Sequence, residues 1–149
     1  MDLIQQTSGS LNYVDLLDKE FAYGGRGPEF YDCYGLIMEL HKRIGIELPE
    51  YKSEKEPNLI QLRIIEGRKL FKQLEKPEPH SVVTFFIKPY ITSHLGFMLD
   101  ERRFIHIMIK SRVTVEKIDS DDTERRDGDN DHGGMDSGFY RNRDSPHLH

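Results

Sequence analysis

Residues 32–45 read Asp-Cys-Tyr-Gly-Leu-Ile-Met-Glu-Leu-His-Lys-Arg-Ile-Gly, and the interpretation of the whole chain starts from this stretch. Its apolar residues recur at intervals of three and four, which is typical of one buried face of a helix. These residues are Leu36, Ile37, Leu40 and Ile44. Asp32 suits the N-cap of such a helix, and Gly45 suits its C-terminal cap. The pattern therefore predicts a helix that begins at or beside Cys33.

Cys33 is the one cysteine of the chain, so it forms no internal disulfide and builds no zinc site by itself. We therefore expect neither a metal nor another cofactor. A thiol in the first turn of a helix lies beside unpaired N–H groups and the positive end of the helix dipole, which favour the thiolate. The sequence Tyr-Gly-Gly-Arg-Gly-Pro at 23–28 predicts a loop that brings backbone close to this thiol. The alternative is a small buried side chain that only packs against its own helix.

The rest of the chain separates into helical and extended patterns. Helices are expected over 11–21 and over 58–74, with Asn58 as the cap of the second and Gly67 weakening it without ending it. After residue 79, short β-branched and aromatic runs predict strands. These runs cover 82–87, 94–99, 104–109 and 113–115. Helices followed by adjacent strands predict an α+β fold with helices packed on an antiparallel sheet.

Two of these runs carry histidines, His94 and His106, on either side of a polar turn. If paired positions of the hairpin sum to 200, the two histidines face each other directly. A sum of 202 leaves them diagonal on one face, and an odd sum such as 203 places them on opposite faces. A thiol nucleophile needs an imidazole within hydrogen-bond reach and a third polar group that orients the imidazole. Each histidine alone is equally well explained as a half-buried strand residue.

The charges are distributed unevenly. Residues 119–149 hold 4 of the 21 Lys and Arg residues and 9 of the 26 Asp and Glu residues, so all of the net charge of -5 lies there. We predict a neutral domain over 1–118 and a flexible acidic tail over 119–149, in which 138–141 returns as a short edge strand. No basic face is available for nucleic acid, and no apolar run is long enough to span a membrane. The first residues resemble no export signal, so we expect synthesis in the cytoplasm.

Five blocks of the sequence, in order, resemble the motifs of the NlpC-type papain-like cysteine peptidases of bacterial cell walls. The blocks are Tyr-Gly-Gly at 23–25, Asp-Cys-Tyr-Gly-Leu at 32–36, Gly-Ile-Glu-Leu-Pro at 45–49, Ser-His-Leu-Gly-Phe-Met-Leu at 93–99 and Arg-Phe-Ile-His at 103–106. The resemblance implies a papain-like α+β fold and hydrolysis of amide bonds in peptidoglycan stem peptides. It also implies that Cys33 is the nucleophile, His94 the general base and His106 the residue that orients His94.

Several positions differ from the common pattern of that family. Tyr34 replaces the usual serine after the nucleophile, which resembles the members found in phage tail assembly modules. Phe21 stands where a tyrosine is common, so Tyr23 is the candidate for a hydroxyl at the site. Substrate or oxyanion support is expected from Tyr23, Arg26, Asp32 and Tyr34, with Arg26 placed to meet a substrate carboxylate. The pattern favours a protein associated with a phage tail or virion, with tail proteins as partners.

Two alternatives stay open at the level of the sequence. One is a structural component of a phage tail that keeps the fold and has lost efficient catalysis, which the changes at Phe21 and Tyr34 permit. The other is an amidase or acyltransferase that uses the same thiol and histidines, because such a site transfers acyl groups to whichever nucleophile enters.

Overall fold

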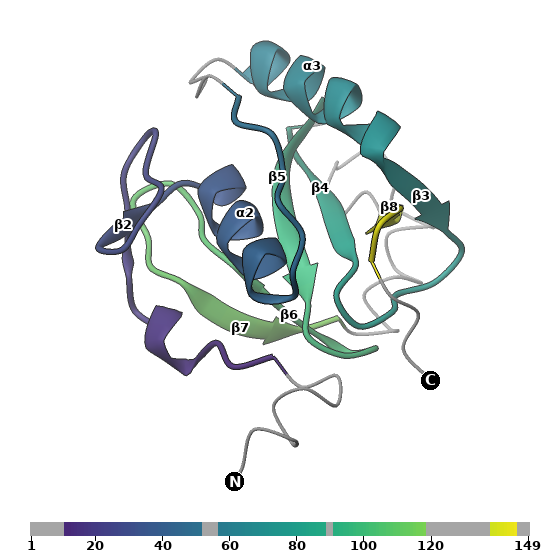
Figure 1. Ribbon diagram of the computed structural model, residues 1–149. Helices are drawn as coiled ribbons and strands as arrows, with labels where there is room; N and C mark the ends of the chain where they lie inside the picture. Colours follow the sequence, from purple (N-terminus) through teal and green to yellow (C-terminus); the bar gives the residue numbers. More distant parts are fainter. Residues whose placement is uncertain (1–10, 52–56, 89–90, 119–137, 146–149) are drawn as a thin grey trace, which may run out of the picture.

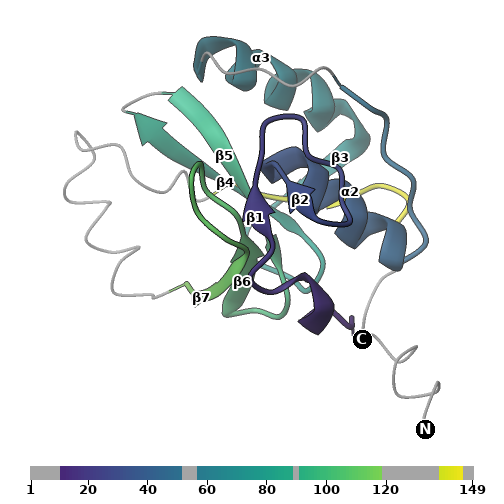
Figure 2. The ribbon, with the colours of Figure 1, turned by 90° about the vertical axis from the view of Figure 1, so that its left-hand side faces the viewer.

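A computed structural model of the chain describes residues 11–51, 57–88, 91–118 and 138–145, and its architecture is α+β (Figure 1). The helices α2 and α3 lie on the same side of a six-stranded antiparallel sheet (Figures 1 and 2). The helical elements are η1 (Val14–Leu16), α2 (Cys33–Arg43), α3 (Pro57–Gly67) and η2 (Arg68–Leu70). The strands are β1 (Glu20–Phe21), β2 (Phe30–Tyr31), β3 (Phe71–Leu74), β4 (Val82–Lys88), β5 (Ile91–Met98), β6 (Arg103–His106), β7 (Thr114–Lys117) and β8 (Gly138–Asn142). The predicted fold class is therefore confirmed.

The helix that begins at Cys33 has the expected caps. The Asp32 side chain accepts a hydrogen bond of 2.6 Å from the backbone N–H of Gly35, which fixes the start of α2. Gly45 has a positive φ of 88°, a conformation that glycine adopts without steric cost, and the N–H of Ile46 donates to the carbonyl of His41. Leu36, Ile37 and Leu40 of this helix are buried against the sheet.

Two predicted helices were wrong in extent. Over 11–21 the chain forms only the single turn η1, because Asp18 and Lys19 exchange backbone hydrogen bonds with Val113 and β1 pairs with β2. The second helix ends at Gly67 instead of continuing to residue 74, and Phe71–Leu74 forms β3. In both places backbone pairing with a distant segment outweighs a local apolar period of three and four.

The predicted strands are present, and the register of the β5–β6 hairpin keeps the two histidines together. Gly96 pairs with His106 and Phe97 with Ile105, so paired positions sum to 202. His94 and His106 are therefore diagonal neighbours on one face of the sheet. In the next pair Phe104 lies opposite Glu116 and His106 lies opposite Thr114, so Glu116 is in turn diagonal to His106.

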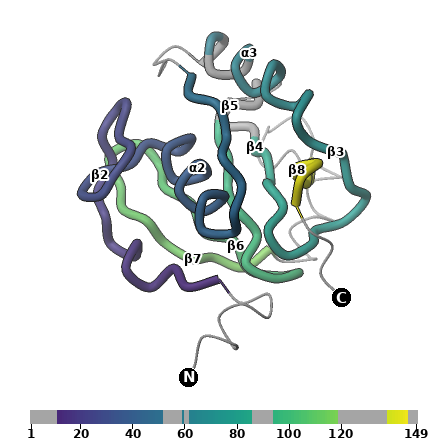
Figure 3. Tube along the Cα trace, viewed as in Figure 1, coloured from purple at the N-terminus to yellow at the C-terminus, as the bar shows by residue number. Residues whose placement is uncertain are grey.

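The returning strand near the C-terminus lies inside the sheet, which has the strand order β3-β8-β4-β5-β6-β7. β8 pairs with both β3 and β4, so its expected place at an edge was wrong (Figure 3). Phe139 of β8 is buried with Val83, Phe85 and Phe104 on the face of the sheet opposite α2. The acidic residues 119–137 lie outside the described residues, so the flexible tail and the domain boundary stay predictions. In the described part of the chain, no helix has the length and apolar character needed to cross a bilayer.

Replacing Phe139 with alanine should destabilise the domain by about 3 kcal/mol, because it removes a buried aromatic ring from the middle of the sheet. Urea unfolding of F139A measures the loss, and Lys72→Ala on the exposed side of β3 is the matched control. An unchanged free energy of unfolding in F139A would show that β8 does not belong to the sheet.

His41 makes the fold sensitive to acid. Its ring is buried against Phe71 and Phe97, and burial lowers its pKa to about 4. In the unfolded chain the pKa returns to about 6.5, so the unfolded state binds more protons between these two values. The contribution of His41 to the free energy of unfolding should therefore fall by about 2 kcal/mol between pH ~7 and pH ~4.5.

Urea unfolding at both pH values tests this expectation, with His41→Leu as the comparison. The variant should lose less stability on acidification than the wild type does. Equal losses in both proteins would remove His41 as the cause and leave His94, whose pKa burial also lowers, to explain them.

Candidate active site

Asp32 joins the loop before Cys33 to the start of α2. Besides Gly35, its carboxylate accepts hydrogen bonds from the backbone N–H of Gly24, at 3.1 Å, and from Arg26 Nη1, at 2.7 Å. Gly35 is required here because a Cβ atom at this position would collide with the carbonyl of Gly25. The glycine-rich loop therefore lies directly on the first turn of α2 and fixes the position of Cys33.

Cys33 is placed against β5 at the point where that strand separates from β6. The N–H of Leu99 donates to the carbonyl of Arg103, so odd-numbered residues of β5 direct their N–H groups toward β6. The pairing of these strands ends at Gly96 and His106, one residue short of Leu95. The N–H of Leu95 is near the sulfur of Cys33 and acts to lower the pKa of that thiol. The thiol therefore lies beside the residue that follows His94.

The two histidines and an unpredicted glutamate form a line of hydrogen bonds across three strands. Nε2 of His94 lies 2.8 Å from Nδ1 of His106, and Nε2 of His106 lies 2.6 Å from Oε2 of Glu116. Both histidines are buried, whereas the Glu116 side chain is 57% exposed. The rings of Phe85 and Phe104 pack around the pair and exclude water from it. Nδ1 is the nitrogen of His94 that this line leaves for a nucleophile.

Burial sets the resting protonation state of Cys33 and His94. Desolvation, with a smaller effect of the Asp32 carboxylate, raises the pKa of the Cys33 thiol to about 12. The N–H groups of Leu95 and Tyr34 oppose this shift but are outweighed. Desolvation and the neighbouring His106 lower the pKa of His94 to about 3. The expectation that the helix terminus favours a thiolate was therefore wrong for the free protein, in which thiol and imidazole are both neutral.

The Cys33 thiol lies beside β5, the strand that carries His94, but the two side chains are not hydrogen-bonded to each other. Among the described residues, no hydrogen bond joins the Cys33 sulfur to the His94 ring, and His94 bonds to His106. Catalytic hydrogen bonds are often long in free enzymes and shorten only when substrate is bound. The structure thus places the partially exposed Cys33 next to the strand that carries His94.

The predicted support residues have structural roles. Arg26 is paired with Asp32 and with Glu50, where its Nε lies 2.8 Å from Oε1, and its contact with a substrate carboxylate stays a prediction. The Tyr34 hydroxyl donates to the carbonyl of Pro49. Arg26 also donates to the carbonyl of Tyr51, whose ring contacts that of Tyr34. Arg26 and Tyr34 therefore hold the segment 49–51 against the start of α2.

Tyr23 is 44% exposed and packs edge-on against Phe21. Its neighbour Gly24 is bonded to Asp32, so this part of the loop stays close to the start of α2. A role for the Tyr23 hydroxyl at the site remains a prediction.

Sequence reasoning missed Glu116 and Glu50. The predicted strand ended at residue 115, and the register that places Glu116 beside His106 depends on a β6–β7 pairing with no local signal. Glu50 was assigned to a polar loop, and only the fold brings it to Arg26. Extending the predicted strand 113–115 by one residue, with alternating side chains, would have placed Glu116 on the face of the sheet that carries the two histidines.

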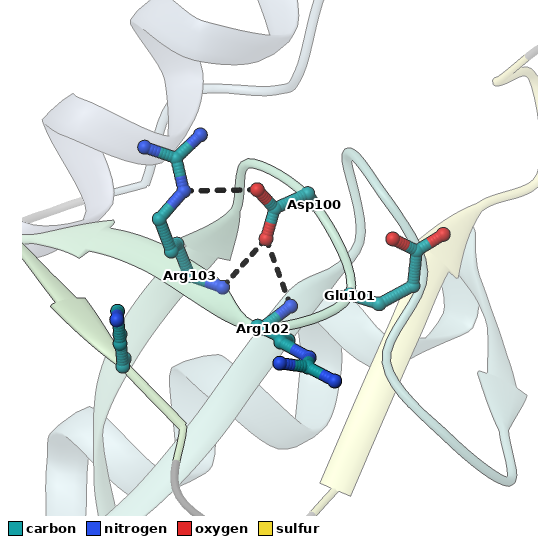
Figure 4. Close-up of a pocket in the computed structure, with 5 residues that line it drawn as sticks. Asp100, Glu101, Arg102 and Arg103 are labelled. Atoms are coloured by element: carbon teal, nitrogen blue, oxygen red, sulfur yellow. Dashed lines mark hydrogen bonds and ion pairs between the residues drawn. The ribbon is translucent and has the colours of Figure 1, made fainter.

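A shallow pocket at the turn between β5 and β6 lies apart from these residues (Figure 4). It is lined by Asp100, Glu101, Arg102, Arg103 and Lys117. The Asp100 carboxylate accepts from the backbone N–H groups of Arg102 and Arg103, which closes the turn (Figure 4). The pocket is thus explained by the hairpin itself. No three His, Cys, Asp or Glu side chains gather as a metal site within 11–51, 57–88, 91–118 and 138–145.

A cysteine at a helix start and a hydrogen-bonded histidine pair on the neighbouring strands are residue types that thiol hydrolases use. The family model described as the NlpC/P60 family matches residues 18–127, so the chain belongs to the NlpC/P60 family. This finding confirms the family resemblance of the sequence motifs. The search among curated proteins returned no match.

Three solved structures share the fold. NlpC1 from Trichomonas vaginalis is similar with a TM-score of 0.59 and 18% identity, covering 93% of this chain and 44% of that chain. NlpC2 from the same organism has a TM-score of 0.56 and 18% identity, covering 85% and 43%. A protein described as similar to a lipoprotein of the NLP/P60 family, from Staphylococcus aureus, has a TM-score of 0.57 and 16% identity, covering 93% and 42%. This chain therefore spans less than half the length of each of these three.

The raised pKa of Cys33 predicts slow alkylation at neutral pH. The rate of reaction with iodoacetamide should keep rising above pH ~9, because an ordinary thiol is half ionised near 8.5 and this one is not. Mass spectrometry follows the reaction at one site, since the chain has a single cysteine, and Cys33→Ser is the blank. A rate that levels off below pH ~7 would contradict the neutral resting state.

Proposed function

We propose that the protein is a cysteine peptidase that hydrolyses amide bonds in peptidoglycan stem peptides, with Cys33 as nucleophile, His94 as general base and His106 as the residue that orients His94. Membership of the NlpC/P60 family supports a peptidase-type function directed at cell walls. The observation that carries the residue roles is the bond between His94 and His106, next to the contact of Leu95 with the Cys33 sulfur. A phage tail setting, tail proteins as partners and cytoplasmic synthesis belong to the same proposal.

The reaction starts from a neutral thiol and a neutral imidazole. As the Cys33 sulfur attacks the substrate carbonyl carbon, Nδ1 of His94 takes the thiol proton, so the ion pair forms during the step. The carbonyl oxygen becomes an oxyanion at the start of α2, where the N–H of Cys33 has no acceptor within the helix and is the donor we assign to it. Forming charge only in the transition state is compatible with a buried site.

The second half of the reaction returns the protein to its resting state. The His94 imidazolium donates its proton to the leaving amine as the carbon–nitrogen bond breaks, which leaves a thioester on Cys33. His94 then takes a proton from water, whose oxygen attacks the thioester carbonyl. Collapse of that intermediate releases the carboxylic acid, and His94 gives the proton back to the Cys33 sulfur.

Purified stem peptides incubated with the wild type should be cleaved, and Cys33→Ala should reduce cleavage to background. His94→Ala should lower kcat by about a hundredfold or more, because the thiol then lacks its base. Mass spectrometry of the products measures both effects and identifies the scissile bond. Arg102→Ala, on the turn apart from the site, is the matched control with unchanged turnover.

The same assay separates the two alternatives. The high pKa of Cys33 is the observation that favours a structural component with little catalysis. Undiminished cleavage by a folded Cys33→Ala would contradict the peptidase, and absence of cleavage by every protein would favour the structural component. Products that carry an added amine in place of water would identify an acyltransferase.

A further inference from the structure

Glu116 is the third member of the hydrogen-bonded line, and its position is a consequence of the sheet register. β7 is the edge strand next to β6 (Figures 1 and 2). The register of these strands places Glu116 opposite Phe104 and diagonal to His106. Its Oε2 lies 2.6 Å from Nε2 of His106, a length typical of a hydrogen bond to a charged partner. The carboxylate therefore reaches a buried imidazole from the solvent side of the sheet.

The chemistry of the three groups determines where the protons are. An ionised carboxylate only accepts hydrogen bonds, so Nε2 of His106 must carry a hydrogen. In a neutral His106 ring, Nδ1 then has the lone pair and accepts from Nε2 of His94, 2.8 Å away. A neutral His94 with its hydrogen on Nε2 has its lone pair on Nδ1. Only this form of His94 accepts the thiol proton at Nδ1.

Without the carboxylate, the opposite arrangement becomes available. His106 then carries its hydrogen on Nδ1 and donates to Nε2 of His94, which moves the hydrogen of His94 to Nδ1. In that form His94 has no lone pair for the thiol at Nδ1. The two tautomeric arrangements of His94 and His106 have similar geometry, so the Glu116 carboxylate decides between them.

We propose that Glu116 is a positioning residue that, through His106, holds His94 in the tautomer with an unprotonated Nδ1. The proposal rests on the proposed role of His94 as the base for Cys33, whereas the tautomer itself is measurable without any catalysis. Among the described residues, the ionisable side chain that is hydrogen-bonded to the histidine pair is Glu116 from β7. The other ring contacts of the pair come from Phe85 and Phe104.

A purely structural role explains Glu116 less well. Its side chain is 57% exposed on an edge strand, and exposed ion pairs add little stability. Replacing it should leave the thermal unfolding transition close to that of the wild type. A carboxylate that is dispensable for the fold but bonded to a buried histidine is expected to act on that histidine.

The tautomers are measured by two-bond ¹H–¹⁵N spectra of the histidine rings in the full chain at a pH where both rings are neutral. The wild type and Glu101→Ala, an exposed carboxylate on the neighbouring turn, should show His94 protonated at Nε2. Glu116→Ala should shift a substantial fraction of His94 to the Nδ1-protonated form, and Glu116→Gln, which keeps an acceptor oxygen, should shift less. Unchanged ring signals in Glu116→Ala would overturn the proposal.

Kinetics on stem peptides supply the second readout. Glu116→Ala should lower kcat by about tenfold with KM unchanged, because a hydrogen bond to a charged group is lost and the substrate contacts are not. Glu116→Gln should recover part of kcat, and Glu101→Ala should match the wild type. A changed tautomer with unchanged kcat in Glu116→Ala would overturn the link to catalysis, whereas inactivity of the wild type itself would count against the proposed function and leave the tautomer result standing.

Discussion

The separation of β6 from β5 after the Gly96–His106 pair is the constraint on which the site depends. Leu95, the residue of β5 next to this pair, has its N–H near the Cys33 sulfur, where it acts to lower the pKa of the thiol. The Asp32 cap and the close approach of Gly25 to Gly35 hold the start of α2 at this point. Backbone geometry thereby positions Cys33 and the strand that carries His94.

Burial of the same region determines the electrostatics. Leu36, Ile37 and Leu40 cover one face of the sheet, while Phe85 and Phe104 enclose the histidines on the other. Low polarity disfavours each charged form, so the pKa of Cys33 rises and that of His94 falls. Neutral groups in such surroundings are oriented by hydrogen bonds. In the account proposed above, the hydrogen bonds from His94 to His106 and from His106 to Glu116 supply that orientation.

Much of this organisation was predictable from the sequence, and the failures have a common physical cause. The caps at Asp32 and Gly45, the α+β class and the shared face of His94 and His106 follow from local patterns of period two and three to four. Pairing between distant segments determines what the local patterns miss. It sets the extents of the helices near residues 11–21 and 67–74, the interior place of β8 and the position of Glu116 beside His106. The pairing of Arg26 with Glu50 has the same origin, since Glu50 reaches Arg26 only in the fold.

The most direct measurement is a crystal structure of the protein with a stem-peptide aldehyde bound covalently to Cys33, because it shows nucleophile, base and oxyanion site together. The predicted result is a bond from the aldehyde carbon to the Cys33 sulfur, with Nδ1 of His94 facing that sulfur and with the bonds from His94 to His106 and from His106 to Glu116 retained. An unmodified Cys33, or an adduct from which the His94 ring points away, would contradict the assignment of this line of residues as the catalytic centre.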